Sequence, residues 1–582
     1  MNKIFQFGEK DILGRVISVD TATAVIEIDD LEKLRCMQVN RLVALESNAG
    51  QHLIGLIEKI TRKAIDALLE GKENDAEVVE QNLVRISLIG TLFDKRGTHE
   101  NVFTRTVESV PRINAACFPV EGESLTRFMQ VIAQVAQDDL KKSLLIGNYT
   151  LDERAEAYLH GDRFFQRHAV VVGSTGSGKS WTTARLLEQV ANLPQGNAIV
   201  FDIHGEYNTM QADGFRHFRI AGSSDLEKKT SLDDGVLYLP YWLLSYEALV
   251  SMLVDRSDQN APNQAMIMSR AIIKAKQKSL ENAGQKEIIE NFTIDSPVPF
   301  NILDVEAELN SINTEMVTGS SCRDKQGDFH GKLSRLIARL EAKISDRRLG
   351  FLFKPPTETS AFEWLNEFAT VLIAGRADQK DGKGGVKIID FSEVPSDILP
   401  LMVSLIAKLA FSIHQWQPSN KRHPIALFCD EAHLYIPDTN NTDAAGEVSV
   451  DIFERIAKEG RKYGVGLVVI SQRPSEVNKT VLSQCNNLLA MRLTNGEDQS
   501  VIKKLLPDSL GGFGDVLPIL DIGEALIVGD ASLLPSRIRI KEPSFEPSSA
   551  TIPFWKKWSD DIKIGGVSDA VNNWRRQSMK RT

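Results

Sequence analysis

Residues 173–180, GSTGSGKS, combine residue types and a spacing that are suited to binding phosphate groups. An apolar run at residues 169–172 precedes this loop, and a helical pattern follows it until Pro194. The glycines let backbone N–H groups converge on phosphate oxygens at the start of the helix, whose partial positive charge adds to the attraction. The Lys179 ammonium can then reach the β- and γ-phosphates, and the Ser180 hydroxyl can ligate Mg²⁺. The segment predicts a nucleotide site; the alternative is a glycine-rich turn without a ligand. The predicted nucleotide-binding residues are Gly173, Ser174, Thr175, Gly176, Ser177, Gly178, Lys179, Ser180 and Trp181.

Paired acids follow a second apolar run, at residues 424–429. In a nucleotide hydrolase, Asp430 would hold Mg²⁺ through water and Glu431 would polarise the attacking water. The alternative is a strand that ends in a solvated acidic turn. A further apolar run at residues 464–470 ends beside Gln472, which is placed to sense the γ-phosphate or to orient the water.

A third apolar run, at residues 197–203, ends in a polar segment that contains Asp202, His204 and Glu206. Ligands bind at the carboxyl ends of parallel strands in doubly wound sheets. We therefore expect this segment to lie beside the phosphate-binding loop.

These residues need an α/β core to position them, and the pattern predicts one at residues 169–241 and 351–540. Within the second part, strands are expected at 369–374 and 386–391, helices at 397–414 and 453–463, and closing strands at 488–493 and 525–528. Residues 242–350 predict an inserted helical subdomain, with helices at 246–254, 264–279 and 333–344. Its basic residues are expected to form either a solvated face or a nucleic-acid contact.

The flanking regions have a different character. Residues 1–110 predict a small β-barrel, with short β-branched segments at 12–19, 23–28, 41–45, 53–60, 84–92 and 102–107 and a helix-like stretch at 61–71. Residues 111–168 predict a connector with a helix at 125–135. Residues 541–582 form a tail whose tryptophans and basic residues either dock, stay disordered or contact single-stranded nucleic acid.

Composition narrows the function classes. The net charge is −10, so nucleic-acid contact would need a local basic surface. The cysteines, at positions 36, 117, 322, 429 and 485, have no C-x-x-C pairing, which favours reduced thiols over disulfides or a zinc site. The N-terminus lacks a signal-peptide core and no apolar run approaches ~18 residues. We therefore expect a cytoplasmic protein without a membrane anchor.

The motifs, in their order, resemble the HerA family of the FtsK–HerA hexameric P-loop ATPases. The resemblance rests on these segments: ILGRV (12–16), LIGLI (53–57), RH (167–168), GSTGSGKS (173–180), DIHGEY (202–207), KIIDFS (387–392), DEAH (430–433), EGRKYG (459–464) and SQRP (471–474). It implies an α/β, RecA-like core with an N-terminal β-barrel. It also implies a homo-hexameric ring that uses ATP and Mg²⁺ to translocate double-stranded DNA, commonly with a nuclease or, in bacterial anti-phage operons, another effector.

The resemblance also implies roles for individual residues. Lys179 and Ser180 match the Walker A positions, and Asp430 and Glu431 match Walker B. Gln472 matches the sensor glutamine. Arg461 matches the arginine finger that acts on the neighbouring subunit's site; the alternative is a cation that favours the helix C-terminus before Gly464. Arg167 corresponds to a basic position that contacts nucleotide. The implied catalytic residues are Lys179, Glu431, Arg461 and Gln472.

The sequence motifs are compatible with two functions. The first is an ATP-driven DNA translocase or helicase that works with a partner in DNA-end processing or anti-phage defence, with pore contacts expected from residues 437–448 or 473–479. The second is an ATP-dependent ring scaffold that assembles and activates a partner effector, such as a nuclease or an NAD-consuming sirtuin-like subunit, with DNA movement secondary.

Overall fold

The structure, a computed structural model, divides the chain into two compact units. The first unit comprises Met1–Phe164, Asn487–Arg492 and Asp515–Glu542, and the second comprises Phe165–Asn486, Leu493–Gly514 and Pro543–Thr582. The described residues are 3–35, 37–67, 77–133, 143–222, 225–228, 230–318, 324–379, 382–438, 443–506, 514–548, 552–559 and 565–576.

The first unit contains a closed barrel. Its strands pair in the order β2, β1, β7, β3, β4 and β5, and a further pairing of β2 with β5 closes the ring, while β6 extends β5. The interior is filled by alternating apolar side chains such as Val16, Ile26 and Ile86. This confirms the predicted barrel. The strands are β1 (Gly14–Val19), β2 (Thr23–Glu27), β3 (Leu42–Glu46), β4 (Gln51–Ala67), β5 (Glu77–Arg96), β6 (His99–Thr104) and β7 (Ala116–Pro119).

The expected helix-like stretch at residues 61–71 is wrong in its described part. Strand β4 continues to Ala67 and pairs with β5 as far as Glu77, and residues 68–71 lie outside the described residues. The helix formers of this stretch are overridden by cross-strand contacts. The Arg62 guanidinium, for example, donates to Asn82 Oδ1 at 3.1 Å and to Glu80 Oε2 at 2.6 Å.

Residues 111–168, expected as a connector, supply much of this unit. Strand β7 completes the barrel, and α2 (Gly122–Ile132) packs its apolar face into a second core with Phe5 and Leu534. A separate antiparallel run has the order β19, β20, β21, β8, β9. These elements are α1 (Leu31–Arg35), β8 (Leu144–Tyr149), β9 (Asp152–Leu159), α3 (Gly161–Gln166), β19 (Asn487–Ala490), β20 (Glu524–Gly529) and β21 (Ser536–Ile540).

The second unit is built on a parallel sheet with the strand order β13, β12, β16, β11, β17, β18, β10. Nearly every residue of its central strands is buried, as expected for a parallel sheet covered on both faces. The α/β core predicted from the sequence is confirmed. The strands are β10 (Ala169–Val172), β11 (Ala198–Asp202), β12 (Phe215–Ile220), β13 (Val236–Leu237), β16 (Val386–Asp390), β17 (Ile425–Cys429) and β18 (Val465–Ser471).

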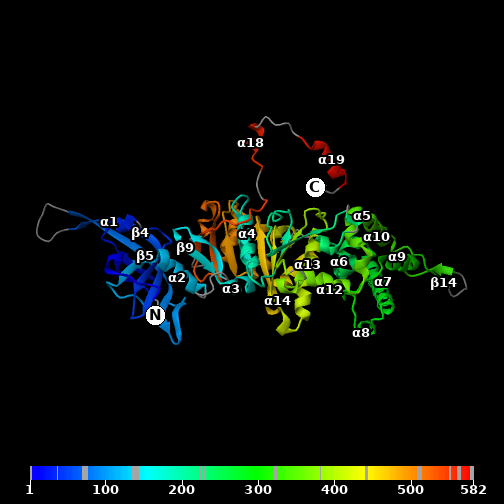
Figure 1. The fold of residues 1–582 in the computed structure, drawn as a ribbon, viewed down its shortest axis with the longest axis horizontal. Coiled ribbons are helices and arrows are strands. Elements are labelled where there is room, and N and C mark those ends of the chain that lie inside the picture. The colour runs from blue at the N-terminus through cyan, green and yellow to red at the C-terminus, as the bar shows by residue number, and fades with distance from the viewer. Residues whose placement is uncertain are drawn as a thin grey trace. The chain divides into compact units, whose positions relative to one another are not determined.

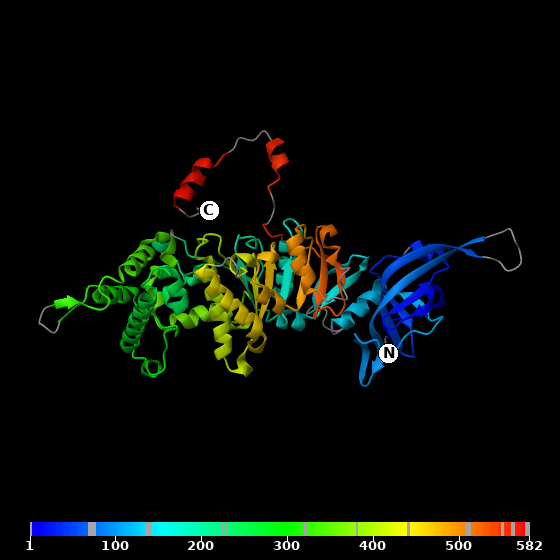
Figure 2. The same ribbon diagram turned by 180° about the vertical axis from the view of Figure 1, so that it is seen from behind.

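Helices cover this sheet and form the inserted group, which Figures 1 and 2 show as α7, α9 and α10 gathered near α6, with β14 projecting beyond them. Helix α13 packs against α14, and α14 packs on β18. The helices and the remaining strands before the tail are α4 (Lys179–Ala191), α5 (Asp225–Lys228), α6 (Tyr246–Leu253), α7 (Ala261–Asn282), α8 (Lys286–Ile289), α9 (Ile302–Asn313), β14 (Met316–Thr318), β15 (Asp324–Gln326), α10 (Ser334–Ser345), α11 (Gly350–Phe353), α12 (Trp364–Ile373), α13 (Leu399–Trp416), α14 (Ala444–Tyr463), α15 (Lys479–Gln484) and α16 (Gly496–Leu505). The tail contains α18 (Phe554–Ser559) and α19 (Val567–Arg576).

Two expectations about this unit need correction. The strand expected at residues 369–374 is the second half of helix α12, whose buried Phe368 and Leu372 are four residues apart and so share one helical face. Helix α13 is long and apolar enough to span a bilayer by length and composition, contrary to the expectation that no apolar run approaches that length. Most of α13 is buried within the fold, which accounts for its composition.

Strand β16 carries a fully buried lysine. The Lys387 ammonium donates to Asn197 Oδ1 at 2.6 Å and to the Ala374 carbonyl at 2.7 Å. Burial, with Arg216 nearby, lowers the pKa of Lys387 to about 7 from its ordinary value of 10.5. The folded protein therefore favours the neutral amine above neutral pH, whereas the unfolded chain keeps its proton.

We expect the free energy of unfolding of the wild type, relative to a Lys387→Met variant, to increase as the pH rises from about 7 to about 10. The unfolded chain binds one more proton than the folded chain in this window, so the slope is about 1.4 kcal/mol per pH unit at most. Urea unfolding of both proteins at pH 7, 8 and 9 measures it. A difference that does not change with pH would contradict the assignment.

Candidate nucleotide site

The phosphate-binding loop joins β10 to α4. Gly176 and Gly178 have positive φ angles of 73° and 104°, which non-glycine side chains rarely adopt. No atom lies within 4 Å of a Cβ built on Gly176, so it is the positive φ angle and not crowding that favours glycine at this position. Helix α4 begins at Lys179, directly after the loop. The backbone therefore has the shape that receives a phosphate chain at a helix N-terminus.

Lys179 lies among acids from the end of β17. Its ammonium is 2.9 Å from Glu431 Oε1 and 3.8 Å from Asp430 Oδ1, and all three side chains are buried. Burial raises the pKa of Asp430 to about 7, even though Lys179 acts to lower it. Burial also acts to raise the pKa of Glu431, but Lys179 and the Gln472 amide outweigh it and the net shift is downward. Glu431 is thus held as the carboxylate.

Glu431 has an unusual backbone as well as an unusual environment. Its φ angle of 45° places it in the left-handed region, where a side chain other than glycine is strained. The chain turns at this residue, directly after β17. The side chains of Asp430 and Glu431 are both buried in the site. Such strain is typical of functional positions.

Gln472 connects the loop to the acids. Its amide nitrogen donates to Glu431 Oε1, and its amide oxygen accepts from the Thr175 hydroxyl at 2.6 Å. His433 lies on the other side, with Nδ1 3.4 Å from Glu431 Oε2, and burial lowers its pKa. The structure thus brings together the sequence-predicted Lys179, Glu431 and Gln472, and it adds Thr175 as the residue that fixes Gln472.

We expect Gln472→Ala to lower the ATP turnover by about tenfold to a hundredfold while nucleotide affinity changes little. The reason is that the variant removes the group that orients Glu431, and misplacement of a catalytic group by about 1 Å costs on this order. Turnover and fluorescent-nucleotide binding measure the two effects. Gln499→Ala, on α16, is the control. A loss of affinity equal to the loss of turnover would show that Gln472 acts in binding instead.

Two buried polar atoms of the site accept or donate no hydrogen bond within the described part of the chain: Ser177 Oγ and Glu431 Oε2. Phosphate oxygens and a water molecule would supply their partners, so the residues present fit a nucleotide. Mg²⁺ usually keeps several waters and takes one or two carboxylates together with substrate phosphates. Asp430 and the half-buried Ser180 are suited to hold it there.

The segment after β11 shapes the same edge of the sheet. Asp202 accepts the backbone N–H groups of Glu206 at 2.9 Å and Tyr207 at 3.0 Å, and burial raises its pKa to about 6. Asp202 therefore holds the loop rather than reaching the phosphates. Glu206 acts electrostatically on Lys179, so the segment lies beside the phosphate-binding loop as expected.

The start of the tail crosses helix α4, a contact that no local pattern indicated. The Phe545 N–H donates to the buried Glu188 carboxylate of α4 at 3.0 Å, and the Ser548 N–H donates to the Glu206 carbonyl at 2.7 Å. Phe545 also packs edge-on against Phe215, with ring centroids 6.4 Å apart. Residues 543–548 are therefore docked, and they cover the helix that follows the phosphate-binding loop.

Arg461 and Arg167 lie at the other edge of the sheet from the phosphate-binding loop. Strand β18 separates Arg461 before it from Gln472 after it, and its seven residues span about 20 Å at roughly 3.3 Å each. Arg167 comes before β10, whose other end leads into the loop. Both side chains are exposed. Neither arginine therefore lies beside the phosphate-binding loop of its own chain.

Buried His168 organises this second edge. Its Nδ1 accepts the Leu467 N–H at 2.9 Å, and its Nε2 lies 3.1 Å from the Ala457 carbonyl, to which it can donate. Burial lowers the pKa of His168 to about 4, so the ring is neutral and each nitrogen has one partner. Arg461 acts electrostatically on this ring. His168 thus ties the chain beside Arg167 to the helix that carries Arg461.

Comparisons with known proteins bear on this site. The family model described as "Helicase HerA, central domain" matches residues 144–410, and "Helicase HerA-like C-terminal" matches residues 376–531. The chain is 25% identical over 417 residues to the "DNA double-strand break repair helicase HerA" of Saccharolobus solfataricus, covering 70% of this chain and 71% of the relative. It is also 25% identical over 555 residues to a "Probable helicase" of Methanocaldococcus jannaschii, covering 91% and 96%. Among solved structures, VirB4 of Thermoanaerobacter pseudethanolicus matches with a TM-score of 0.44 and 16% identity, covering 71% of this chain and 97% of that one.

Proposed function

The chain belongs to the HerA helicase family of P-loop ATPases, and we propose that it hydrolyses ATP as a homo-hexameric ring to translocate double-stranded DNA. The observation that carries the proposal is the separation of Arg461 from the phosphate-binding loop across β18. One chain presents the phosphate-binding groups at one sheet edge and an exposed arginine at the other. Head-to-tail contacts between such edges generate a ring where the rotation from one subunit to the next closes, which is the arrangement proposed.

In this account each active site is shared by two subunits. One contributes Lys179, Glu431 and Gln472, and the next contributes Arg461. The planar, permanently charged guanidinium is suited to the charge on the transferred phosphoryl group. Arg167, at the same edge as Arg461, would act from the same neighbour on the nucleotide. The alternative for Arg461 is a role confined to the C-terminus of α14.

Nucleotide binding changes the partners of Lys179. Phosphate oxygens compete with Glu431 for the Lys179 ammonium, so binding releases the carboxylate to act on water. Water attacks the γ-phosphorus in line, the bond to the β–γ bridging oxygen breaks, ADP leaves, and Glu431 accepts the proton of the water. Gln472 holds Glu431 in position through its bond to Thr175. Asp430 and Ser180 would hold Mg²⁺, which would supply neutralisation of the phosphate charge.

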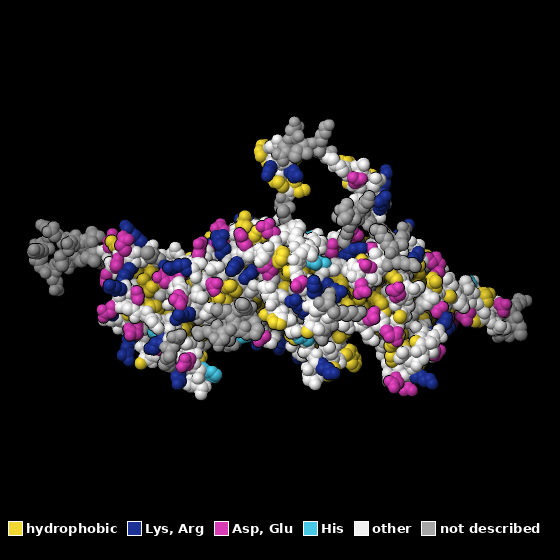
Figure 3. Space-filling view, in the orientation of Figure 1, with side chains coloured by type: hydrophobic (Ala, Val, Ile, Leu, Met, Phe, Trp, Pro, Cys, Tyr) yellow, Lys and Arg dark blue, Asp and Glu magenta, His cyan; other side chains and the backbone are white. Residues whose placement is uncertain are grey.

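DNA contact in this account is local, because the net charge is −10. Figure 3 shows basic and acidic side chains interspersed over the face that it presents. The loops after β17 and β18 are the candidate pore contacts. Residues 439–442 of the first loop lie outside the described residues, and in the second Lys479 pairs with Asp438 at 2.8 Å and Arg473 with Glu476 at 2.7 Å.

The barrel, residues 1–110 extended by β7, is the proposed docking module for a partner, either a nuclease or another effector such as a sirtuin-like subunit. The relative from Saccharolobus solfataricus is named a DNA double-strand break repair helicase, which favours DNA-end processing. The proposed location is the cytoplasm, and anti-phage defence is a further proposed context. The second candidate function is a ring scaffold that activates its partner with DNA movement secondary; the separate barrel unit and the negative charge favour it.

ATP turnover with and without duplex DNA, at 50 to 300 mM salt, separates the two functions. The translocase predicts stimulation by DNA that falls steeply with salt, because each phosphate contact releases counterions. Turnover that ignores DNA and responds only to a partner protein would support the scaffold and overturn the translocase.

A further inference from the structure

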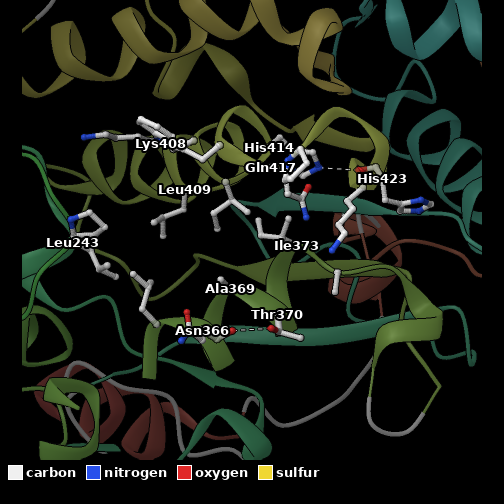
Figure 4. Close-up of a pocket in the computed structure, with 18 of the residues that line it drawn as sticks. Leu243, Asn366, Ala369, Thr370, Ile373, Lys408, Leu409, His414, Gln417 and His423 are labelled. Atoms are coloured by element: carbon white, nitrogen blue, oxygen red, sulfur yellow. Dashed lines mark hydrogen bonds between the residues drawn. The ribbon is translucent and has the colours of Figure 1, made fainter. Parts of the chain in front are cut away.

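A cavity of about 690 Å³ lies between α12 and α13, apart from the nucleotide site. Its walls are mainly apolar and include Leu243, Leu365, Ala369, Ile373, Leu409 and Ile413. Figure 4 shows Asn366, Ala369, Thr370 and Ile373 along one wall and Leu409 along the other. A volume between about 300 and 1,000 Å³ with an apolar lining and few polar groups is typical of small-molecule sites.

The polar groups of the cavity differ between its two ends, as Figure 4 shows. At one end, His414 and His423 already have partners. The two ring nitrogens of His414 lie 2.8 Å from the carbonyl oxygens of Ala410 and His423, and His423 Nε2 lies 2.8 Å from the Gln195 carbonyl. Because backbone carbonyl groups already occupy these imidazole nitrogens, the two histidines do not indicate whether a ligand would be charged.

Lys408 lies at the other end, above Leu243 in Figure 4. Within the described ranges, no hydrogen bond or ion pair joins its ammonium to another residue, and the ammonium is not among the buried atoms that lack a partner, so water reaches it. Burial lowers the pKa of Lys408; Asp295 and Glu247 act to raise it and Arg455 to lower it. The Asp295 carboxylate already accepts the Tyr246 N–H at 2.9 Å. An anion beside this partly buried cation would favour its charged form, which burial disfavours.

Two lysines, Lys408 and Lys421, and one acid, Asp295, are among the residues that line the cavity. Lys421 is exposed and lines the cavity, and Asp295 is the acid among the lining residues. Trp416, whose side chain is 86% exposed, stands at the same surface. The lining therefore combines apolar walls, two lysines against one acid, and an exposed aromatic ring. These features suit a ligand with an apolar body and one negative charge.

We propose that this cavity binds a small amphipathic carboxylate, with its carboxylate on Lys408 and its apolar body between α12 and α13. The size of the cavity favours a small molecule over a macromolecular segment. Helix α13 packs against α14, the helix that carries Arg461. A ligand in this cavity can therefore influence the position of Arg461. The inference does not depend on the proposed DNA activity, since it concerns binding by the isolated protein.

Decanoate and its neutral analogue decanol are the probes, titrated into the full-length protein by calorimetry with tryptophan fluorescence as a second signal. We expect saturable binding of one decanoate per chain and weaker binding of decanol. Lys408→Met should weaken decanoate binding by about tenfold, because a charge-assisted hydrogen bond is lost, and leave decanol unchanged. Ala369→Phe should remove binding of both by filling the cavity.

Lys286→Met, on exposed α8, is the matched control and should bind decanoate as the wild type does. Trp416→Phe should bind decanoate but lose most of the fluorescence change, which places the ligand at this cavity. A thermal unfolding midpoint near that of the wild type checks the fold of each variant. Equal affinity of the wild type and Lys408→Met for decanoate, undiminished binding by Ala369→Phe, or no saturable binding to the wild type would each overturn the proposal.

Discussion

Replacement of Glu431 by glutamine is expected to lower the steady-state ATP turnover by about a hundredfold or more while nucleotide binding is retained. The variant keeps the size of the side chain and removes the carboxylate that accepts the proton of water, a contribution of about 10² to 10⁴ in rate. In the wild type the ion pair with Lys179 keeps Glu431 charged despite its burial. Turnover and nucleotide affinity are measured on the same preparation.

Glu459→Gln provides the matched control, since this glutamate is only half-buried on α14 and its carboxylate lies 3.9 Å from Arg455 Nε, outside the nucleotide site. It should turn over ATP at the wild-type rate. If Glu431→Gln kept more than a third of the wild-type turnover, the assignment of Glu431 as the base would be wrong. If nucleotide binding were lost together with turnover, Glu431 would be needed to shape the site instead.

Replacement of Arg461 by alanine is expected to lower turnover by about a thousandfold, the lower end of the range for an arginine finger. Nucleotide affinity should change by less than about fivefold, because the phosphate-binding loop of the same chain lies across the sheet from Arg461. Lys462→Ala removes the adjacent exposed cation and should have little effect. Wild-type turnover in Arg461→Ala would reduce Arg461 to a cation at the helix C-terminus.

Local motifs were sufficient to predict much of the site. Glycines at fixed positions before Lys179 prescribe a loop and a helix start, and the apolar runs before Asp430 and Gln472 are buried strands, as predicted. The parallel arrangement then brings the ends of β10, β17 and β18 to one edge. Spacing along the chain was therefore enough to predict that Lys179 and Glu431 meet.

Contacts between distant segments could not be predicted in this way. The bond from Thr175 to Gln472 and the contact of Phe545 with Glu188 depend on how separate elements pack, and neither pair has a sequence signature. The two wrong secondary-structure predictions have the same origin. Residues 61–67 are a strand because β5 pairs with them, and residues 369–373 are helical because one face of α12 packs inward.

If each active site is shared between neighbouring subunits, a ring assembled from the two inactive variants contains some intact sites. Glu431→Gln and Arg461→Ala proteins are combined in equal amounts under conditions of subunit exchange, which mass measurement confirms. Random assembly in a ring gives about a quarter of interfaces with an intact Glu431 on one side and an intact Arg461 on the other. Turnover should return to roughly that fraction of the wild-type rate, which is the result expected for shared sites. A mixture that exchanges subunits and stays as inactive as its two components would contradict it.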